Sequence, residues 1–118
     1  MSKPILCLDF DGVLHSYTSK WQGAHIIPDD PVPGMQAFLE AAVKVFDVQV
    51  YSTRSNQPGG IEAMALWLTW KLPPDVMAQI SFPTSKPPAL VTLDDRAYRF
   101  EGVWPDVEML RTLKPWNK

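Results

Sequence analysis

The apolar residues of this chain form short, largely continuous runs that alternate with stretches of helical spacing. Residues 4–8 and 90–93 are runs of the first kind, and acidic residues follow each of them at once. Such runs are typical of buried strands that are covered on both faces. The β-rich segment 48–52 predicts another strand, and we expect short strands at 79–82 and 102–104.

Three segments carry the spacing of helices. Apolar side chains recur every three or four residues from 35 to 46 and again from 61 to 72, which predicts two amphipathic helices. Two prolines at 73–74 end the second one. A short helix is expected from 106 to about 114. Residues 13–33 have no sustained period, which indicates a hairpin-like flap or a functional loop.

The order of these elements predicts an α/β fold with a mainly parallel sheet and helices on both faces. The length suits one domain over residues 1–118, with 13–33 as an inserted flap. Only seven residues separate the expected strands at 79–82 and 90–93, fewer than a parallel crossover usually needs. The strand at 79–82 is therefore expected to be short, to lie at an edge, or to be absent.

Composition narrows the class of protein. Apolar residues make up 46% of the chain, and the net charge of -2 offers no strong nucleic-acid signature. The apolar run near the N-terminus is too short for a signal peptide or a membrane span, so no membrane association is expected. Because Cys7 is the single cysteine, no intramolecular disulfide can form, and a cytoplasmic location is the expectation.

Acidic pairs mark the ends of two strands. Asp9 and Asp11 follow the first strand, and Asp94 and Asp95 follow the strand that ends at Leu93. In open α/β sheets, ligands bind beyond the carboxyl ends of the strands, so these carboxylates are expected to converge there. Like charges packed together raise pKa values or demand a cation, and a hard divalent ion such as Mg²⁺ suits oxygen ligands and phosphate chemistry.

The same residues offer a route for phosphoryl transfer. An Asp carboxylate can act as a nucleophile and form an aspartyl phosphate, which is the role we predict for Asp9. If the chain bends after Asp9, Asp11 can reach the leaving-group oxygen as general acid. Ser52 ends the second strand, and Lys86 lies in a loop that can return to the same edge. Both would bind phosphate oxygens.

These residues together resemble the motifs of the haloacid dehalogenase-like (HAD) superfamily, in its phosphatase branch. The first motif is an apolar strand followed by Asp-Phe-Asp-Gly at 9–12, and the second is an apolar strand ending at Ser52, with Arg54 following. The third is Lys86, and the fourth is an apolar strand ending in acids at 94–95. The resemblance implies a Rossmann-like three-layer fold, here with no cap beyond the flap.

The resemblance also implies roles for these residues. Asp9 would attack phosphorus, and Asp11 would protonate the leaving group and then activate water. Ser52 and Lys86 would hold phosphate oxygens. The Mg²⁺ ligands it implies are the Asp9 carboxylate, the Asp11 backbone carbonyl, Asp94 and Asp95, the last bound directly or through water. Because Asp11 is present, phosphoryl transfer is favoured over dehalogenation.

The predicted function is a magnesium-dependent phosphomonoesterase that acts through an aspartyl phosphate on Asp9. Its phosphorylated substrate is open among a nucleotide, a sugar phosphate, a nucleic-acid end and a phosphoprotein. One alternative is a phospho-acceptor signalling module of the receiver type, which uses similar residue types in another chain order. The other is an inactive HAD-like binding protein. The sequence leaves the oligomeric state open.

Four further side chains have competing interpretations. Arg54 is equally well explained by a salt bridge to an acid and by a phosphate contact. His15 and His25 lie in the flap and are expected at the surface rather than as ligands. Trp21, an aromatic residue in the polar flap, is expected to be a hydrophobic anchor, with stacking on a substrate as the alternative.

Overall fold

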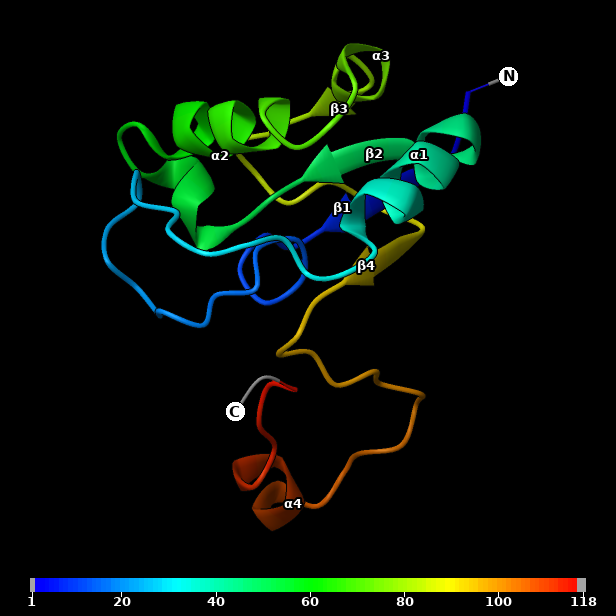
Figure 1. The fold of residues 1–118 in the computed structure, drawn as a ribbon. Coiled ribbons are helices and arrows are strands. Elements are labelled where there is room, and N and C mark those ends of the chain that lie inside the picture. Colours follow the sequence, from blue (N-terminus) through cyan, green and yellow to red (C-terminus); the bar gives the residue numbers. More distant parts are fainter. Residues whose placement is uncertain (1, 117–118) are drawn as a thin grey trace.

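The computed structural model describes residues 2–116 and contains a four-stranded parallel sheet (Figure 1). The strands, in sheet order, are β3 (Ile80–Ser81), β2 (Asp47–Val50), β1 (Ile5–Leu8) and β4 (Val91–Leu93). The register aligns Leu8 with Val50 on one side and with Leu93 on the other. The predicted α/β class and the parallel sheet are confirmed.

The helices follow the predicted spacing with small shifts at their ends. They are α1 (Met35–Val45), the 3₁₀ helix η1 (Thr53–Asn56), α2 (Gly60–Thr69), α3 (Pro74–Met77) and α4 (Val107–Arg111). α2 ends before the predicted limit of 72, and a turn leads from it to Pro73. Within residues 2–116 no helix has the length and apolar character needed to cross a membrane.

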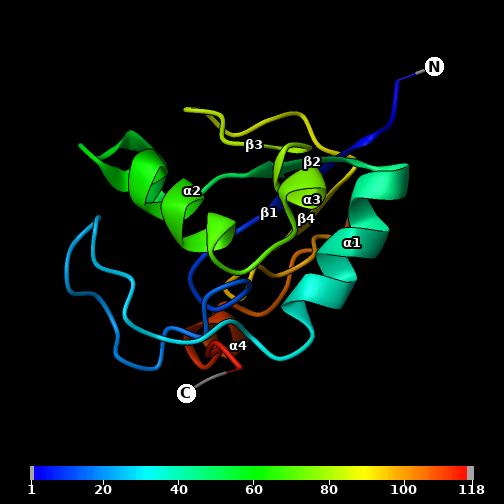
Figure 2. The ribbon, with the colours of Figure 1, turned by 45° about the horizontal axis from the view of Figure 1, so that its top comes forward.

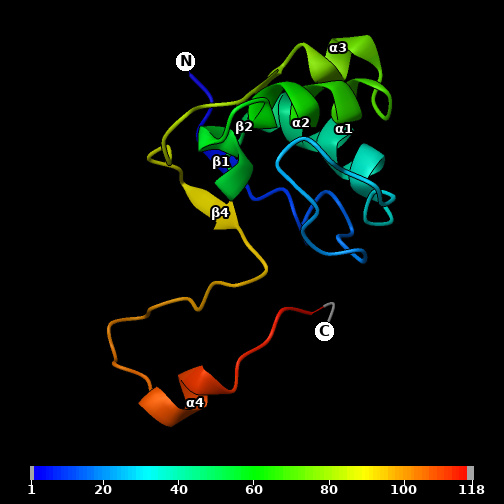
Figure 3. The same cartoon turned by 90° about the vertical axis from the view of Figure 1, so that its left-hand side faces the viewer.

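The core lies between one face of the sheet and three helices. Leu6 and Leu8 of β1 share this core with Val48 and Val50 of β2 and with buried residues of α1, α2 and α3. Figures 2 and 3 show these helices side by side on the same side of the strands. Both crossovers, β1–α1–β2 and β2–α2–α3–β3, step in one direction along the sheet, so a right-handed connection places their helices on one face.

The predicted helix layer on the opposite face is not confirmed. The return from β3 to β4 is the connection that would supply it, and residues 82–90 form no helix there. β3 has two residues and lies at the edge of the sheet, as its short connection indicated. The strand residues on this second face include Cys7, Gln49 and Thr92, which alternate with the core-facing positions.

The chain after β4 leaves the sheet as a C-terminal arm, residues 96–116 (Figures 1 and 3). The strand predicted at 102–104 is wrong: the arm has no neighbouring strand with which to pair, and Trp104 is 85% exposed. The chain exposes 7615 Å². A compact monomer of its mass would expose about 6,450 Å². The arm returns at Trp116, whose indole N–H donates to the Gly12 carbonyl at 2.6 Å.

Candidate metal and phosphoryl-transfer site

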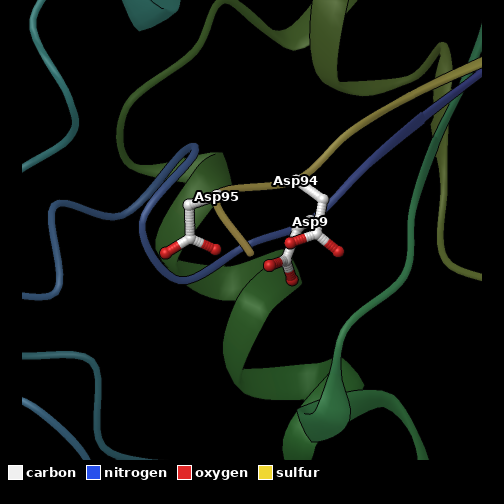
Figure 4. A group of neighbouring side chains, drawn as sticks. All are labelled: Asp9, Asp94 and Asp95. Atoms are coloured by element: carbon white, nitrogen blue, oxygen red, sulfur yellow. The ribbon is translucent and has the colours of Figure 1, made fainter. Parts of the chain in front are cut away.

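Three carboxylates meet beyond the carboxyl ends of the two adjacent strands β1 and β4. Asp9, Asp94 and Asp95 each offer an oxygen, and these oxygens all lie within 4.8 Å of one another. Figure 4 shows Asp9 approaching from the end of β1 and the other two from the end of β4. The Asp9 N–H donates to the Leu93 carbonyl at 3.0 Å, which continues the pairing of the two strands into the site. The predicted convergence of acids is confirmed for these three residues.

The turn after β1 depends on a glycine. Gly12 has a φ of +83°, a conformation that side-chain-bearing residues rarely adopt. A Cβ at this position would also overlap with the carboxylate of Asp95. Gly12 therefore lets β1 turn sharply while the acidic end of β4 approaches its backbone.

The Asp9 carboxyl resists ionisation in the metal-free protein. Burial is the main cause and raises its pKa, the Phe10 N–H at 2.8 Å lowers it, and the neighbouring charges of Asp94 and Asp95 raise it again. The resulting pKa is about 7. A bound cation would offset both the cost of burying the Asp9 charge and its repulsion by the neighbouring carboxylates. The donor set therefore fits a divalent ion that prefers oxygen ligands.

Binding of a divalent cation is therefore expected to weaken below about pH 7, because Asp9 must lose its proton before it can act as a ligand. Titration calorimetry with Mg²⁺ between pH 5.5 and 8.5 should show affinity falling by about tenfold per pH unit on the acid side and levelling off above pH 7. An affinity that does not vary over this range would contradict the assignment of Asp9. Asp9→Asn is the control, and its Mg²⁺ affinity should not show this dependence on pH near neutrality.

The Asp11 carboxylate does not join this group and is held by a second network. Arg54 donates to it through Nε at 2.9 Å and through a terminal nitrogen at 3.1 Å. Nδ1 of His15 lies 2.8 Å from the same carboxylate. Burial raises the pKa of Asp11, but the hydrogen bonds from His15 and Arg54 and the Arg54 charge outweigh it and hold the pKa below its usual value. The metal role predicted for Asp11 concerns its backbone carbonyl and stays a prediction.

Arg54 is fully buried and joins the flap to Asp11. Its remaining terminal nitrogen donates to the carbonyls of Gly23, Ala24 and Ile26, at 2.9, 2.9 and 3.2 Å. Of the two interpretations left open by the sequence, the structure bears out the salt bridge. The sequence could not reveal the partner, since residues 11 and 54 are brought together only by the adjacency of β1 and β2.

The prediction that His15 lies at the surface is wrong, because its side chain is completely buried. Nε2 accepts the Asp29 N–H at 3.1 Å, so Nδ1 of the neutral ring carries the proton and donates to Asp11. Asp11 and Asp29 lie on either side of the ring and fix its orientation. Because the flap has no helical or strand period, no pattern along the chain indicated this burial.

The two predicted phosphate ligands occupy different environments. Ser52 follows β2 and is buried, and its hydroxyl oxygen accepts the Arg54 N–H at 3.0 Å as the cap of η1. Lys86 is exposed in the loop between β3 and β4, and within residues 2–116 it forms no ion pair. Thr53, which sequence reasoning did not select, lines the cleft beside Asp9.

Several hollows border the acids. One, about 710 Å³, runs along β4 beside the C-terminal arm and includes Asp94 and Asp95 but not Asp9. Another, about 680 Å³, lies between Asp95 and the C-terminal arm. A smaller cleft of about 150 Å³ opens at Asp9. Its lining consists of Asp9, Asp11, Tyr17, Trp21, Thr53, Asp95 and Arg96. The flap thus supplies aromatic side chains to the cleft that contains the predicted nucleophile.

Comparison with protein-family models, with curated proteins and with solved structures gave no significant match.

Proposed function

We propose that this protein is a magnesium-dependent phosphomonoesterase of the HAD-like type, with Asp9 as its nucleophile. The observation that carries the proposal is the convergence of Asp9, Asp94 and Asp95 at the carboxyl ends of two adjacent parallel strands. The strand order β3-β2-β1-β4 also agrees with a Rossmann-like sheet, whose ligands bind at this edge. Such a site joins a carboxylate nucleophile to a cation position, which is what phosphoryl transfer requires.

In the proposed reaction, an oxygen of the Asp9 carboxylate forms a bond to phosphorus, and the ester P–O bond breaks. The leaving oxygen takes up a proton and departs as an alcohol. Water then attacks phosphorus, which releases inorganic phosphate and regenerates Asp9. Mg²⁺ held by Asp9, Asp94 and Asp95 would offset the negative charge of the carboxylates and the phosphoryl oxygens. Ser52 and Thr53 carry aliphatic hydroxyl groups shortly after the end of β2 and would donate to the phosphoryl group.

Asp11 suits the second half of this reaction best. Held as a carboxylate by Arg54 and His15, it would accept a proton from the attacking water. To act as the general acid in the first half, Asp11 would have to gain a proton while the Arg54 charge favours its ionised form. The proposal therefore assigns leaving-group protonation to Asp11 only when its contact with Arg54 loosens.

The test is phosphate release from a panel of phosphate esters, measured with Mg²⁺ and with a chelator. The expected result is release that requires Mg²⁺ and returns when the ion is restored after chelation. Release that persists unchanged in excess chelator would overturn the metal-dependent mechanism. A lack of release combined with a stable phosphoryl group on Asp9, seen by mass spectrometry after exposure to a small phosphodonor, would instead support the receiver-type alternative.

A further inference from the structure

Three side chains that line the cleft beside Asp9 have no role in the proposed reaction. Of the side chains that line it, Tyr17 and Trp21 come from the flap, and Arg96 follows the acidic end of β4. None of the three has a part in bond making at Asp9. Two aromatic rings and a cation at the mouth of a phosphoryl-transfer cleft are the groups that bind a planar, anionic ligand.

Trp21 is fixed in place and still open to solvent. Its ring lies 4.8 Å from the guanidinium carbon of Arg54, a stacking contact that holds it over the edge of the cleft. Yet the residue is 43% exposed. A tryptophan used only as a hydrophobic anchor would be expected to bury more of its ring, so the exposed surface remains free for a ligand to stack on.

The backbone of the flap is strained at Tyr17 and at Lys20, the residue before Trp21. Within residues 2–116, Tyr17 and Lys20 are the non-glycine residues with positive φ, both +62°. Such strain persists only where surrounding contacts fix it, and it gathers at ligand sites. Here the contacts are the edge-on packing of the Tyr17 ring against His15, 6.0 Å between centroids, and the Lys20 ammonium 5.7 Å from the same ring.

Arg96 brings a positive charge to the cleft, and among residues 2–116 its guanidinium is not paired with a carboxylate. Its backbone N–H donates to the Asp94 carboxylate at 2.8 Å, which holds the Arg96 backbone beside the acidic cluster. Its side chain is exposed and forms no ion pair in the part of the chain that the structure describes. A guanidinium in this position is suited to a second phosphate on the ligand.

We propose that Tyr17, Trp21 and Arg96 form a leaving-group subsite for nucleotides. This inference rests on the proposed phosphomonoesterase function and names its substrate class. The cleft, about 150 Å³, is smaller than the pockets that enclose whole small molecules, so it takes the phosphoryl group and the atoms next to it. The base then stacks on the exposed surface of Trp21 outside the cleft, and a neighbouring phosphate of the ligand meets Arg96.

The experiment compares two substrates with the same ester and the same sugar, adenosine 5′-monophosphate and ribose 5-phosphate. The wild type is expected to favour the nucleotide by tenfold or more in kcat/KM, the usual gain from stacking one base on an aromatic side chain. Trp21→Leu should lower this preference by about tenfold. Trp70→Leu is the matched control, because Trp70 is an exposed tryptophan at the far end of α2 and outside the cleft, and the preference should be unchanged.

A merely structural role for Trp21 would lower kcat/KM for both substrates alike and leave their ratio unchanged, which would overturn the subsite. A 5′-phosphorylated oligonucleotide distinguishes a nucleic-acid end from a free nucleotide. Arg96→Met should reduce a preference for the oligonucleotide over the mononucleotide.

A binding measurement separates this inference from the proposed function. Asp9→Asn, which lacks the nucleophile, is titrated with adenosine 5′-monophosphate and with ribose 5-phosphate by calorimetry. At least tenfold tighter binding of the nucleotide, lost in Asp9→Asn/Trp21→Leu, supports the subsite even if no turnover is found. Equal binding of the two ligands rejects the subsite, and turnover of both by the wild type would at the same time leave the proposed function standing.

Discussion

Replacing Asp9 by asparagine is expected to lower magnesium-dependent phosphate release by at least about 10³-fold and to stabilise the metal-free protein at pH 8. The first effect follows because the amide cannot attack phosphorus. The second follows because the Asp9 carboxylate is half-buried beside Asp94 and Asp95, so its replacement removes a partly desolvated charge and its repulsion by two neighbours.

The pKa of Asp9 sets the sign of the stability effect. The folded-state pKa of Asp9, about 7, lies above the ordinary value of 3.8. Between these values the folded state binds more protons than the unfolded state, so stability falls as the pH rises from about 4 to about 7. Asp9→Asn should therefore melt at a higher temperature than the wild type at pH 8, by about 5 °C or more, and at nearly the same temperature at pH 4.

Thermal unfolding in a chelating buffer at these two pH values, alongside the phosphate assay, measures both effects. Asp30→Asn is the control, since it removes an exposed carboxylate outside the cluster and should change neither activity nor the pH dependence of melting. Retained activity in Asp9→Asn would reassign the nucleophile. Lost activity combined with a lower melting temperature at pH 8 would mean that Asp9 stabilises the metal-free fold, contrary to its burial.

The parts of the site that the sequence could predict are those that follow from strand ends. An apolar run followed by acids identifies a buried strand and the position of its carboxyl end. Parallel pairing then places the carboxyl ends of neighbouring strands at the same edge of the sheet. Asp9, Asp94 and Asp95 converge for this reason. The periodicity of residues 35–46 predicted α1 equally well, because one buried stripe is enough to specify a surface helix.

The parts that escaped prediction depend on contacts between distant segments with no period of their own. Arg54 binds the flap through three backbone carbonyls, and a sequence does not show which backbone carbonyls will accept such bonds. The burial of His15 has the same origin. The apolar residues at 102–104 resembled a strand, but hydrophobicity alone does not supply an edge with which to pair.

Removal of the Arg54 guanidinium, as in Arg54→Met, is expected to cost about 3–5 kcal/mol of unfolding free energy, the usual effect of breaking a buried ion pair. The substitution leaves the Asp11 carboxylate with its hydrogen bond to His15 and without a charged partner among residues 2–116. It also removes the donor from three flap carbonyls. Arg54→Lys should recover only part of the loss, because one ammonium cannot reproduce the two-pronged contact with Asp11.

Urea denaturation measures the stability, and trypsin reports on the flap, because Lys20 is an exposed cleavage site within it. Arg54→Met should speed cleavage after Lys20 under conditions in which the rest of the protein stays folded. Arg111→Met is the matched control. Arg111 and its partner Glu108 are 76% and 73% exposed, so breaking that pair should change stability by less than about 1 kcal/mol and leave the flap unaffected.

The result also separates two roles for Arg54 in the proposed reaction. If the arginine acts through Asp11 and the flap, Arg54→Met loses stability and flap order together, and the accompanying loss of activity appears mainly in kcat. If Arg54 instead turns to bind the phosphoryl group, the variant keeps its stability and its resistance to trypsin and shows a higher KM. That second outcome would mean that the contacts of Arg54 with Asp11 and the flap carbonyls do not stabilise the protein in solution.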